Sequence, residues 1–564
     1  MGTNKQTKIV IVGGKATGSK AGAILARRLP EAEITLYQKE HYHSYSSCGL
    51  PYFASGDIGS FEQLTVTPYG VSKGPEFYKN SKGFTVVPGA LITEINRRDK
   101  SISGKLLEGN EDFEAPYDKL VLATGSLPNK PAFPVADSPR IRHFVMPEDA
   151  VHFRKLAEGG KIGKVVIIGG GYVGCEMTEA MVGMWGIEAT IVEKENQLLP
   201  YALDFEMSRI VERELSRQGV NVLTGSVVKG IEVDDQGNPV VHIQNREEIA
   251  ADYVFLCIGV SPNIGLAENC GLEIGETGAI RVNDRMQTSD GDIYAGGDCV
   301  ESFNLVTKSS IYIPMGSLAN RHARIIAENI AGKETVFPGV TGTFLIKIFD
   351  LNVGAVGISS GEARKHGMAA KEVWGTFVDK PDYYPEPKRF TLKMIYSGEN
   401  NRLLGLQAVG MGDICRRVDV FSEFLRRGSR VEDLFYLEHG YAPPYSEPLD
   451  PLSEMAGIAG AQKRGVSFLN FAEEIDSEAF FLDTREESEA VGLPWPLPKE
   501  APEGGYLNIP LNDVRNNLDK LDRGRKIVII CSRGARSYQA ALMLKKAGFN
   551  DVHVLGGGTL AALS

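Results

Sequence analysis

The sequence predicts an α/β protein with several domains, on the basis of three observations. Apolar strands run directly into glycine-rich turns that open helical patterns, as in sheets of parallel strands joined by helices. After Phe337, apolar and polar residues alternate in long runs, which is typical of half-buried antiparallel strands. A final block from Phe480 to Gly558 returns to the first pattern. The chain has 564 residues, enough for three or four domains at roughly 150 residues each.

The composition excludes several classes of protein. Hydrophobic residues make up 43% and charged residues 24%, as in ordinary water-soluble globular proteins. The formal net charge of −11 argues against a nucleic-acid partner, which requires a basic surface. There is no run of about 18 apolar residues, and the polar lead before the first strand does not resemble a signal peptide. We therefore expect a cytoplasmic protein with no membrane partner.

The cysteines exclude further classes. The seven cysteines form a scattered set with no C-x-x-C pair. This excludes a zinc ribbon and a thioredoxin-type dithiol, and it argues against a secreted disulfide scaffold. No metal site is expected.

The first strand-turn-helix unit begins with the β-branched run Lys8–Val12. Gly13, Gly14 and Gly18 follow it, and an alanine-rich helical pattern and a second strand come next. Such glycines let the backbone approach a pyrophosphate, and the helix N-terminus stabilises its charge. An acceptor for ribose hydroxyls is expected at the end of the second strand, where Gln38 replaces the usual acid.

The second unit carries a complete G-x-G-x-x-G between a strand and a helix. Its glycines are Gly169, Gly171 and Gly174, and they follow the strand 165–168. The next strand ends in Glu193, where an acid would bind the ribose hydroxyls of NADH and repel the 2′-phosphate of NADPH. This context between a strand and a helix makes a dinucleotide site credible.

Three small-residue turns accompany these units. A buried strand ends in a turn that contains Thr124 and Gly125, and the segment 252–263 echoes it. The segment 288–298 ends in a Gly-Gly-Asp turn whose Asp298 could accept hydrogen bonds from a polyol chain. Each turn alone could be a tightly packed loop, but all five features in this order favour two nucleotide sites.

Cys48 lies in the stretch 44–53, which reads SYSSCGLPYF. A lone cysteine in a loop is more often a buried, inert thiol. The two nucleotide-binding units instead favour a redox cysteine held against a flavin. Because no C-x-x-C is present, such a site would take its second sulfur from the substrate.

A second cysteine, Cys531, follows the apolar strand 526–530 and begins a six-residue loop before a helix. Backbone N–H groups in such a loop can hold an anion, and the helix dipole adds to their field. This field favours a thiolate, and Arg533 and Arg536 would add positive charge. The alternative is a core cysteine at the end of a strand.

These motifs resemble two known families. The order of GGKATG, ATGSLP, GGGYVG, GVSPN and YAGGD resembles the FAD- and pyridine-nucleotide-dependent disulfide reductases. The single cysteine in SYSSCGLPYF and the segment YAPPYS resemble the coenzyme A disulfide reductase branch. The loop CSRGARS resembles that of a rhodanese domain. The whole chain therefore resembles a fusion of the two, of the kind described as NADH-dependent persulfide or polysulfide reductases.

The resemblance implies four domains: two Rossmann-like nucleotide-binding domains (FAD and NAD), an α+β dimerisation domain and a C-terminal α/β rhodanese domain. Their expected residues are 1–150 and 265–335 for FAD, 151–264 for NAD(P)H, 336–455 for dimerisation, 456–474 for a linker and 475–564 for rhodanese.

The resemblance also implies site residues, a homodimer and the cofactors FAD and NADH, with NADPH possible and coenzyme A as a bound ligand or substrate. Catalytic roles fall to Cys48, Cys531, Arg536 and the tyrosines Tyr441 and Tyr383, the tyrosines reaching the redox cysteine from the dimer partner. The expected cofactor-binding residues are Gly13, Gly14, Gly18, Gln38, Thr124, Gly125 and Asp298 for FAD, and Gly169, Gly171, Gly174 and Glu193 for the nicotinamide nucleotide.

Three functions remain open at this stage. The first is a reductase of small-molecule persulfides, polysulfides or coenzyme A disulfides, in which Cys531 handles sulfane sulfur and hydrogen sulfide or a free thiol is released. The second is an NADH oxidase acting on oxygen or peroxide through a sulfenic acid at Cys48. The third is a redox sensor or sulfur carrier without turnover.

Overall fold

The computed structural model describes residues 6–42, 44–471, 479–493 and 505–563. The chain forms two compact units, Met1–Ala189 with Val227–Val340 and Thr190–Ser226 with Thr341–Ser564. Of the predicted boundaries, the linker residues 472–474 and the rhodanese residues 475–478 lie outside the described residues.

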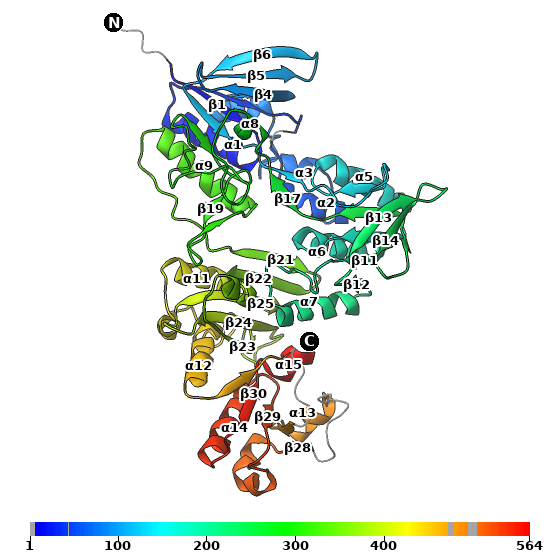
Figure 1. Cartoon of the computed structure of the whole chain (residues 1–564), viewed down its shortest axis with the longest axis vertical. Helices are drawn as coiled ribbons and strands as arrows, with labels where there is room; N and C mark the ends of the chain where they lie inside the picture. Colours follow the sequence, from blue (N-terminus) through cyan, green and yellow to red (C-terminus); the bar gives the residue numbers. More distant parts are fainter. Residues whose placement is uncertain (1–5, 43, 472–478, 494–504, 564) are drawn as a thin grey trace. The chain divides into compact units, whose positions relative to one another are not determined.

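The first unit contains a five-stranded parallel sheet that places the first glycine turn at its carboxyl edge (Figure 1). In sheet order its strands are β18 (Ile293–Ala295), β7 (Lys119–Leu122), β1 (Lys8–Val12), β2 (Glu33–Tyr37) and β3 (Thr85–Val87). The central strands are buried on both faces, which explains their continuous apolar runs. Helices α1 (Ala16–Arg28) and α9 (Gly316–Ile330) pack together, and Arg28 and Glu328 form an ion pair of 2.7 Å between them.

Smaller sheets complete the first unit. An antiparallel sheet contains β4 (Ala90–Asn96), β5 (Ser101–Leu106) and β6 (Glu111–Pro116). A parallel set contains β10 (Lys164–Ile168), β16 (Tyr253–Leu256) and β9 (Ile141–His143). A second antiparallel sheet contains β13 (Val228–Val233), β14 (Pro239–Ile243) and β15 (Ile249–Ala250). The segments that follow β7 and β16 pair through β8 (Ser126–Pro128) and β17 (Val260–Pro262).

Helix α2 (Leu50–Ser55) of the first unit packs against two further helices. They are α5 (Pro147–Glu158) and α6 (Tyr172–Glu179), the last continued by the π-turn Ala180–Met184. Among the described residues, no helix combines the length and the apolar character needed to cross a bilayer.

The second unit contains the predicted antiparallel block. Its five strands, in sheet order, are β21 (Phe344–Ile348), β22 (Leu351–Gly357), β25 (Leu403–Gly410), β24 (Arg389–Ser397) and β23 (Ala370–Val378). Helices α11 (Cys415–Arg426) and α12 (Pro451–Lys463) pack on this sheet, as does α7 (Phe205–Arg217). Strand β11 (Glu188–Val192) runs into this unit and pairs there with β12 (Asn221–Leu223).

A buried charge cluster joins α7 to the antiparallel sheet. Lys393 is 1% exposed and binds Asp204 at 2.8 Å, Glu206 at 2.5 Å and Glu372 at 2.6 Å. The neighbouring acids raise the pKa of Lys393 against the opposing effect of burial, which alone would lower it. A buried lysine is tolerated only with such partners, because an unpaired buried charge is costly.

The C-terminal sheet of the second unit is parallel. Its order is β26 (Ser467–Leu469), β30 (Val552–Leu555), β29 (Ile527–Ile530), β27 (Phe480–Asp483) and β28 (Tyr506–Asn508). Helices α13 (Glu487–Gly492), α14 (Ala535–Lys546) and α15 (Gly558–Leu563) flank it, together with the 3-10 segment Leu511–Lys520. Strand β26 lies within the predicted linker, so part of that segment belongs to this sheet.

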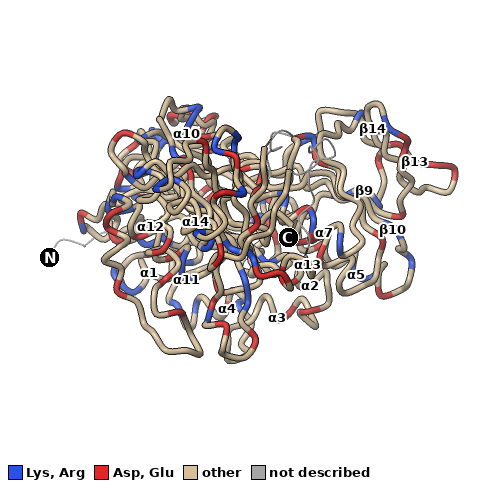
Figure 2. The backbone as a smooth tube through the Cα atoms, turned by 90° about the horizontal axis from the view of Figure 1, so that it is seen from below, with Lys and Arg blue, Asp and Glu red and all other residues tan. Residues whose placement is uncertain are grey.

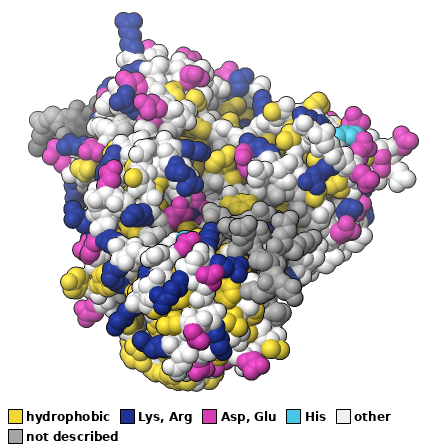
Figure 3. Space-filling model, turned by 60° about the horizontal axis from the view of Figure 1, so that its bottom comes forward, with side chains coloured by type: hydrophobic (Ala, Val, Ile, Leu, Met, Phe, Trp, Pro, Cys, Tyr) yellow, Lys and Arg dark blue, Asp and Glu magenta, His cyan; other side chains and the backbone are white. Residues whose placement is uncertain are grey.

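This last domain is docked on the antiparallel sheet. The Thr376 hydroxyl on β23 donates to the Gly557 carbonyl at 2.7 Å, and a side chain on Gly556 would lie 3.0 Å from the Trp374 ring. Basic and acidic residues are scattered along the coloured part of the backbone (Figure 2), and both signs are interspersed on the face shown in Figure 3.

Candidate active site

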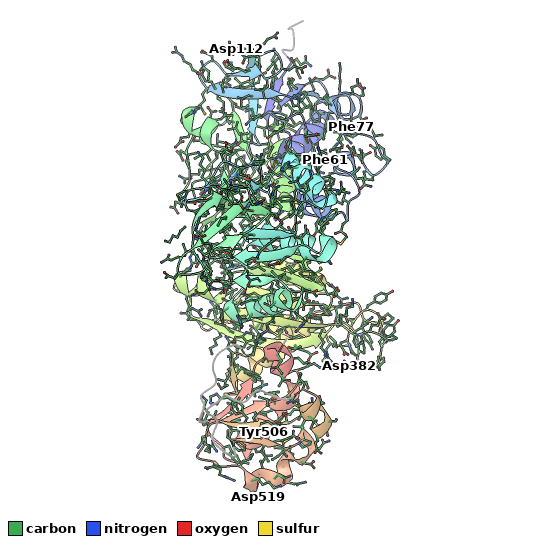
Figure 4. The ribbon with its side chains drawn as sticks, turned by 90° about the vertical axis from the view of Figure 1, so that its right-hand side faces the viewer. Phe61, Phe77, Asp112, Asp382, Tyr506 and Asp519 are labelled. Atoms are coloured by element: carbon green, nitrogen blue, oxygen red, sulfur yellow. The ribbon has the colours of Figure 1, made fainter. Side chains whose placement is uncertain are left out.

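Cys48 sits on the 3-10 turn Ser47–Gly49, directly before α2, and its side chain reaches solvent. Arg154 contacts α2 and the segment that follows this helix. The Arg154 guanidinium of α5 donates to the carbonyls of Phe53 at 3.1 Å and Ile58 at 2.7 Å, and it stacks over the Phe53 ring. Phe53 also contacts Phe61, which is labelled in Figure 4. These contacts fix the position of α2, the helix that begins directly after the turn with Cys48.

The N-terminus of α9 lies next to Cys48. A Cβ atom added to Gly316, the first residue of α9, would lie 3.7 Å from the Cys48 sulfur. A helix N-terminus stabilises a thiolate, because its free N–H groups carry partial positive charge. Burial acts against this and raises the pKa of the Cys48 thiol, with a further increase from Glu176.

Sequence reasoning missed Glu176. It lies on α6, two positions after the third glycine of the second motif, and burial together with Glu179 raises its pKa to about 7. A carboxyl with this pKa can bind or release a proton near neutral pH. Its only signal in the sequence was an acid early in the helix that follows the second glycine motif.

The residues around β1 fit FAD. A Cβ atom on Gly13 would lie 2.1 Å from the Ala123 carbonyl oxygen. A Cβ atom on Gly18 would lie 1.8 Å from the Gly13 carbonyl oxygen. Both positions therefore accommodate only glycine. The Asp298 Oδ1 atom is buried without a hydrogen-bond partner, so it could accept a hydrogen bond from a hydroxyl of a bound polyol chain. Burial also raises the pKa of Asp298.

At the position expected to bind ribose, Gln38 is bonded to two neighbouring residues. Gln38 is buried, and its Oε1 atom accepts from the Gly14 N–H at 2.5 Å. Its amide nitrogen donates to Glu40. A carboxylate therefore does lie beside the end of β2, but Glu40 supplies it. Thr124, in the turn after β7, donates to the Asn263 carbonyl at 2.7 Å, and Gly125 has a φ of +69°.

The second glycine motif has the same construction. Gly169 has a φ of +108°, and its added Cβ atom would lie 2.4 Å from the Cys257 carbonyl oxygen. At Gly174 the added atom would lie 2.0 Å from the Gly169 oxygen, whereas Gly171 borders open space. In the second unit, Glu193 is buried and accepts from the Glu195 N–H at 2.8 Å. The glycines thus leave a backbone surface that a pyrophosphate could approach.

The two predicted tyrosines lie together on the second unit. Tyr383 is 75% exposed on the loop 379–388 between β23 and β24, and Tyr441 is 48% exposed. Their hydroxyls share a hydrogen bond, which raises the pKa of Tyr383. His439 is a neighbour in sequence, but its Nε2 atom is bound to the Glu447 carbonyl at 3.1 Å.

Cys531 is held differently from Cys48. It follows β29, is 1% exposed, and its sulfur accepts from the N–H groups of Gly534 at 3.0 Å and Ser537 at 3.4 Å. The N–H of Thr559 on α15 donates to the Cys531 carbonyl at 2.9 Å. The predicted anion-holding loop is therefore present, and the sulfur occupies it.

A buried ion pair lies at the end of β27, the strand that pairs with β29. Asp483 and Arg485 are both about fully buried and lie 2.6 Å apart. Asp483 also accepts from the hydroxyl of Tyr506, labelled in Figure 4, at 2.9 Å.

Comparisons with known proteins identify the family of the chain. The model of the pyridine nucleotide-disulphide oxidoreductase family matches residues 7–311, and the model of its dimerisation domain matches residues 343–452. The chain belongs to this family. A rhodanese-like domain matches residues 470–562. The predicted fold class and family are confirmed, and with them an FAD- and pyridine-nucleotide-dependent oxidoreductase.

Relatives cover most or all of the chain. A CoA-dependent NAD(P)H sulfur oxidoreductase of Pyrococcus abyssi is 35% identical over 80% of this chain and 97% of its own length. The structure of an NAD-dependent persulfide reductase from A. fulgidus is 36% identical, with a TM-score of 0.93 over 98% of this chain and 100% of that one. The structure of a Bacillus anthracis CoADR-RHD protein is 30% identical, with a TM-score of 0.90 over 99% of this chain and 98% of that one.

Proposed function

We propose that this chain is a cytoplasmic, homodimeric NAD(P)H-dependent reductase of persulfides, polysulfides or coenzyme A disulfides. The observation that carries the proposal is the isolation of Cys48. All seven cysteines are free, and the turn that bears Cys48 stands at a helix N-terminus in the domain that fits FAD. A single thiol can complete a two-electron cycle through a disulfide or persulfide only when the substrate supplies the second sulfur. The dimerisation domain and the names of the relatives support this choice.

Different residues of the chain have different roles in this proposed reaction. FAD, when bound, would relay two electrons from the nicotinamide nucleotide to the sulfur at Cys48. Gly13 and Gly18 admit its pyrophosphate, and Asp298 accepts from its polyol chain. The helix N-terminus at Gly316 stabilises the Cys48 thiolate each time it is regenerated. Glu176 holds or releases a proton near neutral pH.

The thiol that leaves the substrate requires a proton. We assign this role to the hydrogen-bonded pair Tyr383 and Tyr441, contributed by the partner subunit as the family resemblance implies. Cys531 would accept sulfane sulfur, and Arg536 would hold its loop in shape. Glu193 would bind the ribose hydroxyls of the nicotinamide nucleotide.

The decisive experiment follows NADH oxidation by the purified flavoprotein without oxygen, with coenzyme A persulfide as substrate. Cys48→Ser should lower kcat by on the order of 1000-fold or more, a loss of the size seen when a nucleophile is removed. The matched control is Cys415→Ser, which removes another exposed thiol and should leave kcat unchanged. Full turnover by Cys48→Ser would contradict the proposal. Turnover with oxygen or peroxide but with no sulfur compound would support the oxidase instead.

A further inference from the structure

Both arginines of the Cys531 loop are already paired with carboxylates from outside the loop. Sequence reasoning expected Arg533 and Arg536 to leave this loop positively charged. In the structure, Arg536 binds Glu489 of α13, and Arg533 binds Asp382 of the loop 379–388. The positive charge beside Cys531 is therefore largely compensated.

The pair on Arg536 is bidentate. Its two terminal nitrogens donate to the two Glu489 oxygens at 2.5 and 2.7 Å, and one of them also donates to the Ser532 hydroxyl at 3.0 Å. That hydroxyl in turn donates to Glu489 at 2.9 Å. The Arg536 hydrogen bonds lower the pKa of Glu489 to about 2, so the carboxylate stays charged at every physiological pH. The Arg536 N–H groups that could bind an oxyanion are therefore already bound to Glu489 and Ser532.

The pair on Arg533 joins two domains of the second unit. Asp382 is labelled in Figure 4 and lies 151 positions before Arg533 in the sequence. It comes from the dimerisation domain, next to Tyr383, so a residue outside the rhodanese domain sets the charge at the loop of Cys531. Both pairs are partly exposed, so each weakens rather than abolishes the field of its arginine.

These contacts bear on which sulfur donor the loop accepts. Thiosulfate carries two negative charges, and the sulfite that leaves it carries two as well. Such a donor needs cationic groups with free N–H donors at the loop. The –S–SH group of an organic persulfide carries no charge in its protonated form, and any charged groups on its organic part can bind away from the loop. Glu489 and Asp382 therefore penalise the dianion far more than the persulfide.

We propose that Cys531 takes sulfur from an organic persulfide and discriminates against thiosulfate, with Glu489 and Asp382 as the residues that determine this specificity. The inference rests on the proposed role of Cys531 as a sulfur acceptor.

The transfer is balanced for both donors. With a persulfide, the Cys531 thiolate attacks the outer sulfur of R–S–SH. The sulfur–sulfur bond of the donor breaks, R–S⁻ leaves with the electron pair, and Cys531 becomes a persulfide that keeps the proton. With thiosulfate, the same attack releases sulfite with the electron pair. The two reactions differ in charge at the loop, since the encounter brings together one negative charge in the first case and three in the second.

The test measures sulfur transfer to Cys531 in the full-length flavoprotein without NADH. The double variant Cys48→Ser, Cys415→Ser serves as the background, so that no other exposed thiol competes with Cys531. Mass spectrometry of the intact chain follows the gain of one sulfur from glutathione persulfide or from thiosulfate. We expect the thiosulfate rate constant to be at least about 10-fold lower. Glu489→Gln should raise the thiosulfate rate about 5- to 10-fold, as expected for removal of one charge at a partly exposed site, and should change the persulfide rate less than about 2-fold.

Asp382 lies outside the rhodanese domain. Asp382→Asn is therefore a second test variant that can be used if Glu489→Gln does not fold. It should raise the thiosulfate rate in the same direction. Glu487→Gln, on the same helix as Glu489 and exposed, is the matched control and should change neither rate.

Different outcomes overturn different statements. Equal rates for the two donors, or no gain for thiosulfate in either variant while persulfide transfer is intact, would overturn the specificity and leave Cys531 as an acceptor. Failure of Cys531 to gain sulfur from either donor would overturn both the inference and its proposed role.

Discussion

The two reactive cysteines occupy opposite kinds of environment. Cys48 is exposed on a short turn, with the start of α9 beside it and the acid Glu176 raising its pKa. Cys531 is buried, and two backbone N–H groups point at its sulfur. The first sulfur is accessible to solvent, whereas the second is held within its own loop. This difference matches the proposed division into one thiol that exchanges electrons and one that stores sulfur.

The acids near the two sites also differ in effect. Glu176 acts on the thiol of Cys48 itself, and its charge depends on pH near neutrality. Glu489 acts on Arg536 and stays charged. The acid beside Cys48 therefore changes its charge near neutral pH, whereas the acid beside the Cys531 loop does not. Three experiments test this difference.

The largest expected effect separates the two half-reactions. Cys48→Ser should abolish NADH-dependent reduction, by on the order of 1000-fold, but should leave sulfur transfer to Cys531 intact. Cys531→Ser should do the reverse and leave reduction of a free persulfide within about 2-fold, since the two nucleophiles act in separate steps. Anaerobic NADH oxidation and sulfur gain by mass spectrometry report the two activities. If either variant lost both, the division of roles would be wrong.

A smaller effect is expected from alanine at the glycine that shapes each site. Gly534 has a φ of +103° and donates to the Cys531 sulfur, so Gly534→Ala should strain the loop by about 1–3 kcal/mol and slow sulfur transfer roughly 5- to 100-fold. Gly316→Ala adds a methyl group at an ordinary contact distance of 3.7 Å from the Cys48 sulfur. It should change NADH-dependent turnover less than about 3-fold, which is under about 1 kcal/mol. Equal losses in the two assays would contradict the comparison.

The smallest effect concerns pH. A charged Glu176 raises the pKa of Cys48, so Glu176→Gln should move the midpoint of Cys48 alkylation by iodoacetamide to lower pH. Because Glu176 itself has a pKa of about 7, wild type and variant should differ above pH 7 and converge below it. The alkylation rate of Cys48, followed by peptide mass spectrometry in the flavoprotein, measures this. Cys531 alkylation is the internal control and should not change, and a midpoint that stayed in place would show that Glu176 does not act on Cys48.

Much of the fold was predictable because its signals are local. The apolar run Lys8–Val12 and the glycines after it predict a parallel strand and a nucleotide turn, and both are present. The alternation after Phe337 predicts antiparallel strands, and β21 to β25 form that sheet. The π-turn after α6 was not predictable, because no proline or glycine pair marks it.

The site was predictable only in part. Cys48 and Cys531 were found because a loop motif surrounds each of them. Glu40 was not singled out because the ribose-binding position was expected at Gln38, whose amide nitrogen donates to Glu40 in the structure. Glu489 and Asp382 had no local signal, since each meets its arginine only after distant segments pack together.

By itself, the sequence determined the two nucleotide turns, the lone Cys48 and the Cys531 loop, because backbone conformation at glycine and the strand-turn-helix order are set by near neighbours. The tertiary structure alone decided the charge around each sulfur. Charges act through space, and Glu176, Glu489 and Asp382 reach their partners from separate elements. The reactive sulfur atoms could therefore be predicted from the sequence. The electrostatic fields that act on these atoms appeared only in the folded protein.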